Sequence, residues 1–228
     1  LRKQQEEKKQ QIAIEKEAVK TKAEIIQQNK ISLMIEPVSE MIDMFKETQH
    51  WIVAYIDEIV GRNIIKGIAG DTASIQPDWT LRKVELYKMV IHGADIELLE
   101  YNQEAKNILS GSYADIDVTS WYAPYIYTAH VHGWVAQNSD QIFDPKAPVP
   151  RAEALKIMIT IFDKSIPETM YQLTNNDLPF SDTYSNQWYN PYLRYALSEE
   201  IITPQDTFRT GEPIFRGETA KIILELGK

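Results

Sequence analysis

Three cation-x-glutamate pairs recur along the sequence, and their side chains are well suited to binding chemistry. They are Lys83 with Glu85, Arg151 with Glu153, and Arg216 with Glu218. A guanidinium can bind a carboxylate through two parallel hydrogen bonds, which a lysine ammonium cannot do. The pairs therefore predict either a site for an anionic ligand or ion pairs with neighbouring carboxylates of the protein itself.

Three tryptophans recur at similar spacing. Trp51, Trp121 and Trp188 are 70 and 67 residues apart, and each is followed four residues later by a tyrosine. A large aromatic side chain could stack on the face of a sugar, but such side chains more often fill hydrophobic cores. We therefore expect the tryptophans to pack in the core, with sugar stacking as the alternative.

Other kinds of site find little support in the sequence. The chain contains no cysteine, no glycine-rich phosphate loop and no G-x-S-x-G turn of a serine hydrolase. His130 and His132 are two residues apart, a spacing that directs them to different faces of a helix, so we interpret them as surface histidines. The net charge of −9 argues against nucleic-acid binding, which requires a basic face. We expect no enzyme activity, no cofactor and no metal.

Two kinds of helix are expected to position the recurring residues. Ser120 is suited to cap a helix that begins near Trp121. Gly133 suits the left-handed turn that ends such a helix, whereas Glu200, at the equivalent position, suits it less well. A second helix should begin at each cation-x-glutamate pair, where unbonded N–H groups of the first turn would favour an anion. Each unit reads as helix–loop–helix and cannot bury its apolar face alone.

The first 35 residues have a different composition and predict a long N-terminal helix. They are rich in Lys, Glu, Gln, Ala and Ile, and no Gly or Pro precedes Pro37. One row of a coiled-coil seam recurs every seven residues, at Ile12, Val19, Ile26 and Leu33. Polar residues occupy the complementary row, so a solvated helix is slightly favoured over pairing into a homo-oligomer. No apolar run approaches the roughly 20 residues that cross a bilayer, so we expect no membrane span.

The repeated features divide the chain into four segments. We expect a helical stalk over residues 1–44 and three repeats over residues 45–110, 111–177 and 178–228. The three repeats together, residues 45–228, are expected to fold as one unit around a shared core.

The opening motifs of the repeats carry a family resemblance. Tyr113-Ala114-Asp115 and Phe180-Ser181-Asp182 each place an aromatic residue eight positions before Trp121 or Trp188, whereas the first repeat has the looser Phe45-Lys46-Glu47. With the closing cation-x-glutamate pairs, these segments resemble the S-layer homology family, whose repeats open with an aromatic-x-Asp and a Trp and close on an Ile-Thr-Arg-Ala-Glu-like segment. The resemblance covers residues 45–228 and occurs three times.

The resemblance implies an all-α, pseudo-threefold bundle with grooves between its repeats. Family members attach surface proteins non-covalently to secondary cell-wall polysaccharides, often through a sugar that carries a pyruvate ketal, at the bacterial cell surface or S-layer. By this likeness the ligand-binding residues are Lys83, Arg151, Arg216, Trp51, Trp121, Trp188, Asp115 and Asp182. Two alternatives stay open: a peptidoglycan-linked ligand, or an assembly and stalk module that acts through protein–protein contacts.

The sequence departs from the family at three points. Arg82, Pro150 and Phe215 stand where the family has a threonine, so we expect none of the closing helices to have a reciprocal capping box. The first repeat has Lys83 in place of arginine and Glu47 in place of aspartate. One groove is therefore expected to bind weakly.

Overall fold

The computed structural model describes residues 50–62, 64, 76–135, 140–173 and 177–228. The predicted N-terminal helix, its heptad positions and the Phe45–Glu47 motif lie outside these residues. The chain divides into two compact units, and the second, made of Ala54–Lys66 and Ile75–Lys228, contains nearly all described residues. The architecture below is that of this second unit.

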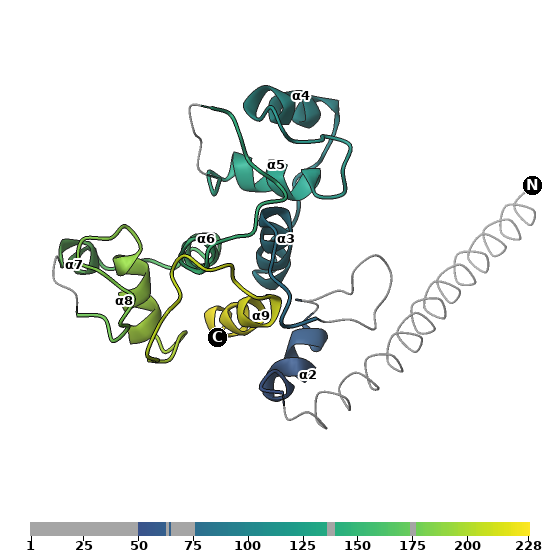
Figure 1. Cartoon of the computed structure of the whole chain (residues 1–228). Coiled ribbons are helices and arrows are strands. Elements are labelled where there is room, and N and C mark those ends of the chain that lie inside the picture. Colours follow the sequence, from purple (N-terminus) through teal and green to yellow (C-terminus); the bar gives the residue numbers. More distant parts are fainter. Residues whose placement is uncertain (1–49, 63, 65–75, 136–139, 174–176) are drawn as a thin grey trace, which may run out of the picture. The chain divides into compact units, whose positions relative to one another are not determined.

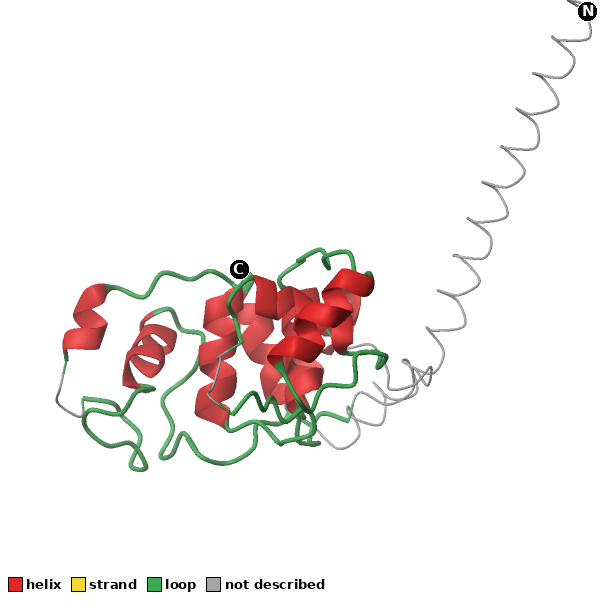
Figure 2. Cartoon of the chain, turned by 90° about the horizontal axis from the view of Figure 1, so that it is seen from above, coloured by secondary structure: helices red, strands yellow, loops and turns green. Residues whose placement is uncertain are grey.

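The prediction of an all-α fold is confirmed, since the described residues form helices joined by loops, without a regular strand (Figure 2). In chain order the helices are α2 (Val53–Gly61), α3 (Lys83–Gly93), α4 (Gln103–Ser112), α5 (Ala123–Val131), α6 (Arg151–Ile161), α7 (Glu168–Gln172), α8 (Asn190–Ser198) and α9 (Arg216–Leu226). None of the described helices is long and apolar enough to cross a membrane.

Three closing helices, α3, α6 and α9, form the centre of the unit (Figure 1). Each begins at the cation of a cation-x-glutamate pair, as predicted, and each packs against the other two. Their equivalent inward positions are fully buried: Leu86, Ala154 and Thr219 in one layer, and Val90, Met158 and Ile223 in the next. The shared core expected from the sequence is thus built by the closing helices.

A closed cycle of backbone hydrogen bonds joins the segments that lead into these helices. The N–H of Leu81 donates to the carbonyl of Ile214 (3.1 Å), Ile214 donates to Val149 (2.9 Å), and Val149 donates back to Leu81 (3.2 Å). All three residues are at most 1% exposed, so water cannot replace these bonds. Because a buried backbone group without a partner is costly, each segment depends on the other two.

The first N–H groups of the closing helices form a second cycle, which runs through the three segments in the opposite order. Lys83 donates to Ala147, Arg151 to Glu212, and Arg216 to Trp79, over distances of 2.8–2.9 Å. The next residue of each helix donates to a second carbonyl of the same loop, in the pairs Val84–Pro145, Ala152–Thr210 and Gly217–Pro77. The expectation that these N–H groups would favour an anionic ligand is therefore wrong, because neighbouring loops already bind them.

The opening helix of the second repeat begins later than the sequence suggested. Helix α5 begins at Ala123, and no side chain caps it. The Ser120 hydroxyl donates to Asp117 (2.9 Å), so it stabilises the preceding turn in place of the helix end. At the other end, Gly133 adopts the predicted left-handed conformation (φ 73°), and Glu200 adopts it too (φ 56°), although its side chain suits it less well.

Two further helices, α4 and α7, lie near the ends of the first and second predicted repeats and were not expected. Asn102 caps α4 by accepting the N–H of Ala105 (3.1 Å). Helix α7 has five residues and none of them is buried. It packs on α8, where the Arg194 guanidinium donates to the carbonyl of Met170 (3.1 Å).

Gly93 should be intolerant of a larger side chain, because an added Cβ would overlap the Ile223 side chain where α3 meets α9. We expect Gly93→Ala to lower the free energy of unfolding by about 1–3 kcal/mol, the usual effect of overpacking, measured by urea denaturation. Gly61→Ala is the matched control, since Gly61 also ends a helix and has open space around it. Equal stability of the two variants would contradict the tight packing of α3 on α9.

Candidate functional site

Two of the three motif cations form ion pairs with glutamates of the same motif in the next repeat. Arg151 Nη1 lies 2.7 Å from Glu218 Oε2, and Lys83 Nζ lies 3.8 Å from Glu153 Oε1. Arg216 is influenced by the charge of Glu85, which raises its pKa against the larger, lowering effect of burial. The ion-pair alternative raised by the sequence is therefore realised at Arg151 and Lys83, and it links successive closing helices.

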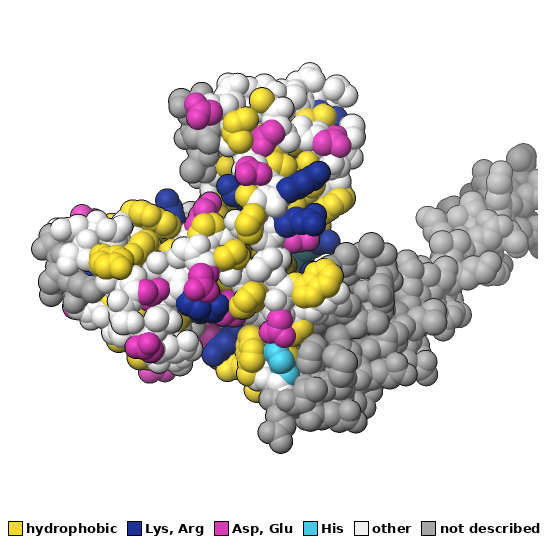
Figure 3. All heavy atoms as spheres, viewed as in Figure 1, with side chains coloured by type: hydrophobic (Ala, Val, Ile, Leu, Met, Phe, Trp, Pro, Cys, Tyr) yellow, Lys and Arg dark blue, Asp and Glu magenta, His cyan; other side chains and the backbone are white. Residues whose placement is uncertain are grey.

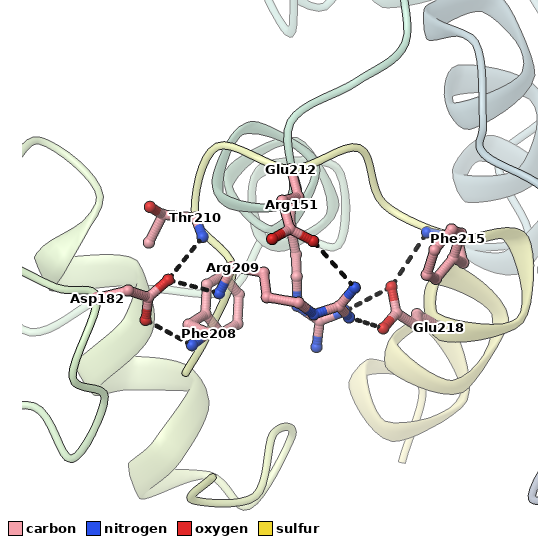
Figure 4. Close-up of polar contacts among 8 residues, drawn as sticks. All are labelled: Arg151, Asp182, Phe208, Arg209, Thr210, Glu212, Phe215 and Glu218. Carbon is pink, nitrogen blue, oxygen red and sulfur yellow. Dashed lines mark hydrogen bonds and ion pairs between the residues drawn. The ribbon is translucent and has the colours of Figure 1, made fainter. Parts of the chain in front are cut away.

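Of the three motif glutamates, Glu218 has the most polar contacts among the described residues (Figure 4). Besides Arg151 it contacts the Arg209 guanidinium, and it accepts the N–H of Phe215 (3.1 Å). The Arg151 guanidinium also lies over the Phe208 ring, 4.7 Å from its centroid. Burial lowers the pKa of Arg151, and the adjacent Glu218 opposes this effect. The Arg151 guanidinium is thus already paired with a carboxylate of the protein itself, that of Glu218.

Two of the motif glutamates make one of the two hydrogen bonds of a capping box. Glu85 accepts the N–H of Arg82 (2.9 Å), and Glu218 does the same for Phe215. Pro150 has no N–H to offer, so Glu153 cannot make this bond. The second bond of a capping box, in which an N-cap side-chain oxygen accepts the backbone N–H three residues on, cannot form, because Arg82, Pro150 and Phe215 carry no side-chain acceptor.

The two aspartates of the opening motifs bind backbone groups of their own repeat. Asp115 accepts the N–H groups of Phe143 and Asp144 at 2.9 and 2.7 Å. Asp182 likewise accepts from Phe208 and Arg209, both at 2.7 Å. Both carboxylates therefore hold the loop that leads to the closing helix, a role that the sequence analysis did not assign to them.

The three tryptophans lie at the surface, so the expectation that they pack in the core is wrong. Their exposed fractions are 42% for Trp51, 54% for Trp121 and 53% for Trp188. The buried positions of the two later opening helices are taken by smaller residues such as Ile126 and Leu193. Exposed tryptophans in equivalent places are a common feature of binding surfaces.

A lysine of a closing helix lies over an opening aromatic residue of the next repeat in each of three places. Lys88 is 5.0 Å from the Trp121 ring centroid, Lys156 is 5.6 Å from that of Trp188, and Lys221 is 5.2 Å from that of Tyr55. These distances are within the range of cation–π attraction. These lysines were not among the residues expected to bind a ligand, although each stands five residues after a motif cation.

The pairing between α6 and α8 is the most complete of the three. Lys156 also lies 6.0 Å from the Tyr192 ring, and α6 packs on α8. We call Lys156, Trp188 and Tyr192 the α6–α8 seam. Within the part of the chain that the structure describes, no carboxylate pairs with Lys156, and the Lys156 side chain is exposed. Its ammonium can therefore reach an anionic group from solvent.

The histidines take part in aromatic contacts. His130 Nδ1 lies 3.0 Å from the Tyr113 hydroxyl, and the His132 ring stacks on Trp134 at 4.4 Å. Among the described residues, no group of three His, Cys, Asp or Glu side chains could hold a metal ion.

Glu218→Gln should destabilise the protein more than Glu153→Gln does. The side chains of Arg151 and Glu218 are 13% and 17% exposed, so removing the negative charge leaves a largely buried guanidinium uncompensated, at a cost of up to about 3 kcal/mol. The Lys83–Glu153 pair is longer and more exposed, and exposed pairs contribute at most about 1 kcal/mol. Urea denaturation measures both; equal losses would contradict the difference in burial.

Asp182 should stabilise the fold in a pH-dependent way. Burial tends to raise its pKa, but the N–H groups of Phe208, Thr210 and Arg209 outweigh burial and hold the pKa below its ordinary value. Its contribution is therefore complete above the unfolded-state pKa, about 3.9, and is lost as the pH falls below it.

Asp182→Asn should accordingly lower the free energy of unfolding more at pH 7 than at pH 3. The exposed Asp163, replaced by Asn, is the control and should change the pH dependence little. An Asp182→Asn loss of the same size at both pH values would show that the charge of the carboxylate is unimportant.

Comparison with known proteins bears on the two later repeats. Residues 112–155 and 179–220 match the family model of the S-layer homology domain, and the first predicted repeat is not matched. A search of curated proteins found no match to the chain. S-layer homology domains are non-enzymatic modules that anchor proteins to the cell wall through secondary cell-wall polymers. The two matched segments are therefore similar to S-layer homology domains, and this similarity indicates association with the cell surface and cell wall.

Proposed function

We propose that this protein anchors a surface protein by binding an acidic secondary cell-wall polysaccharide at the places where one repeat meets the next. The observation that carries the proposal is the threefold recurrence of a closing-helix lysine over an opening aromatic residue, at Lys88, Lys156 and Lys221. One such pairing could be accidental, but three in the same register indicate a repeated site.

The chemistry of the pairing suits an acidic sugar. An exposed indole or phenol ring offers an apolar face to the C–H groups of a pyranose and a polar edge to its hydroxyls. The ammonium beside the ring can make charge-assisted hydrogen bonds to a carboxylate, such as that of a pyruvate ketal. A peptidoglycan-linked ligand with a carboxylate would meet the same groups, so we propose the acidic sugar as the recognised element.

The motif cations have a different part in this proposal. The Arg151 guanidinium is already paired with Glu218, which lies 2.7 Å away and is itself held by Arg209 and Phe215. We therefore propose that Arg151, Arg216 and Lys83 hold the repeats together beside the seams. Asp115 and Asp182 hold the loops, and Trp121, Trp188 and Trp51 provide the sugar-binding surface.

Residues 45–110 act as a third, divergent repeat in this proposal. The support is the equivalence of α3 with α6 and α9 in the backbone cycle, the burial pattern and the lysine register. A pseudo-threefold bundle would give three seams, and the third, at Lys221 and Tyr55, lacks an aspartate-based opening motif in its sequence. We expect that seam to bind more weakly than the other two.

Lys156→Ala should weaken binding to the purified wall polysaccharide. To isolate one seam, the parent protein carries Lys88→Ala and Lys221→Ala. Loss of a charge-assisted hydrogen bond costs about 1.5–3 kcal/mol, so the affinity should fall by about ten- to a hundredfold. Calorimetry measures the affinity, and a pull-down with wall sacculi before and after removal of the polymer identifies the ligand.

Lys146→Ala is the matched control, because Lys146 is an exposed lysine in the loop before α6 and lies over no aromatic ring of the described residues. It should leave the affinity unchanged. Equal affinities of the Lys156→Ala and Lys146→Ala proteins would reject the seam as the binding site. Retention on sacculi stripped of polymer would instead favour protein–protein or peptidoglycan contacts.

A further inference from the structure

The aromatic surface at the α6–α8 seam continues beyond it onto α7. The Tyr171 ring of α7 meets the Tyr192 ring of α8 edge to face, with centroids 6.5 Å apart. Tyr171 is 48% exposed, and Trp188, at the other end, is 53% exposed. Figure 3 shows hydrophobic side chains gathered over α7 and α8, with Lys or Arg at their edge toward α6. The aromatic surface therefore extends further than a site made of one aromatic ring and one lysine would need.

We propose that Tyr171 and Tyr192 form a second sugar subsite, so that the α6–α8 seam binds at least two consecutive sugars of the wall polymer. The proposal rests on the function proposed above and adds the length and order of the recognised unit. The acidic sugar lies at Lys156 and Trp188, and a neutral sugar follows it across Tyr192 and Tyr171.

The spacing along the seam supports two sugars in place of one. Lys156 Nζ lies 5.6 Å from the Trp188 ring centroid and 6.0 Å from that of Tyr192, and the Tyr192 and Tyr171 centroids are 6.5 Å apart. Tyr171 joins this group through its ring contact with Tyr192, so it stands one aromatic contact further from the lysine. A sugar seated at Lys156 leaves Tyr171 for its neighbour in the polymer.

The second subsite is expected to prefer a neutral sugar. Among the residues that the structure describes, no Lys or Arg side chain lies over the Tyr171 ring, unlike the ring of Trp188. Burial raises the pKa of Tyr192, and the adjacent Tyr171 hydroxyl adds to this effect through charge and hydrogen bonding. The Tyr192 phenol therefore stays neutral, and both tyrosines present hydroxyl groups that can hydrogen-bond to sugar hydroxyls.

Helix α7 is held in place by an anchor from α8, although it buries no residue of its own. A helix of five residues is too short to be stable alone. Arg194, only 7% exposed, donates to Asp177 (2.8 Å) and to the carbonyl of Met170 (3.1 Å). This hydrogen bonding lowers the pKa of Asp177, so the pair stays charged. A buried arginine thus fixes a helix whose tyrosine remains half exposed.

The equivalent seam in the second repeat has no such extension. There Tyr125 meets His92 of α3, with the His92 Nε2 atom 2.9 Å from the tyrosine hydroxyl. Helix α4, which occupies the corresponding linker, contains no aromatic residue. Of these two described seams, only the α6–α8 seam is therefore extended by an aromatic residue of a short neighbouring helix, and the α3–α5 seam provides an internal comparison.

The test uses size-fractionated oligosaccharides from the purified wall polysaccharide, in the Lys88→Ala, Lys221→Ala parent that leaves only the α6–α8 lysine. Short fragments contain one acidic sugar, and longer ones contain that sugar with a neutral neighbour. We expect the parent to bind the longer fragment about threefold to tenfold more tightly, as an aromatic contact of about 0.5–1.5 kcal/mol provides. Tyr171→Ala should abolish this gain and leave the affinity for the short fragment unchanged.

Two control variants make the result specific. Tyr171→Phe keeps the ring and should retain most of the gain, and Leu173→Ala, an exposed residue that follows α7, should retain all of it. Circular dichroism melting checks that each variant is folded. If Lys156→Ala removes binding of both fragments but Tyr171→Ala leaves their affinity ratio unchanged, the second subsite is wrong and the proposed function stands. No binding of any fragment by the parent would overturn both.

Discussion

The fold depends on the closed cycle of hydrogen bonds among Leu81, Val149 and Ile214. These buried segments are too short to form a sheet, and each satisfies its N–H and carbonyl groups only through the other two. The cycle fixes where the three closing helices begin, because the N–H groups at the start of each helix donate to carbonyls of a neighbouring loop. The cations at the helix starts are then held beside glutamates of the next helix. A constraint on a few backbone groups thus positions the surface that is proposed to bind the polysaccharide.

Each seam is built from two repeats, so no repeat carries a complete site. Lys156 belongs to the second predicted repeat, and Trp188 and Tyr192 belong to the third. The spacing of the exposed lysine and tryptophan is set by the packing of α6 on α8. The proposed binding would therefore depend on how well the repeats are packed, even though none of the side chains at this seam is in the core.

The sequence predicted those features that follow from local pattern. The helix starts at Lys83, Arg151 and Arg216 and the left-handed turn at Gly133 depend on residues close together in the chain. The exposure of Trp121 and Trp188 could not be predicted, since it depends on which neighbouring surface is available. The bonding of the first-turn N–H groups likewise comes from loops about 60 to 140 residues away in sequence. The equal spacing of the three lysines from the motif cations can be read from the sequence. That each lysine lies over an aromatic ring of another repeat could be seen only in the structure.

The cyclic order of the backbone bonds also determines how a mechanical load is shared. A pull transmitted through α2 reaches the segment around Leu81, which is bonded to both Val149 and Ile214. That segment cannot leave without breaking its bonds to both neighbours at once, whereas in a linear array it could detach from one neighbour at a time. Resistance to forced unfolding is set by the rate of unfolding, so simultaneous rupture slows the response to tension. A closed ring of short segments can therefore hold under tension that would peel an open stack of repeats apart.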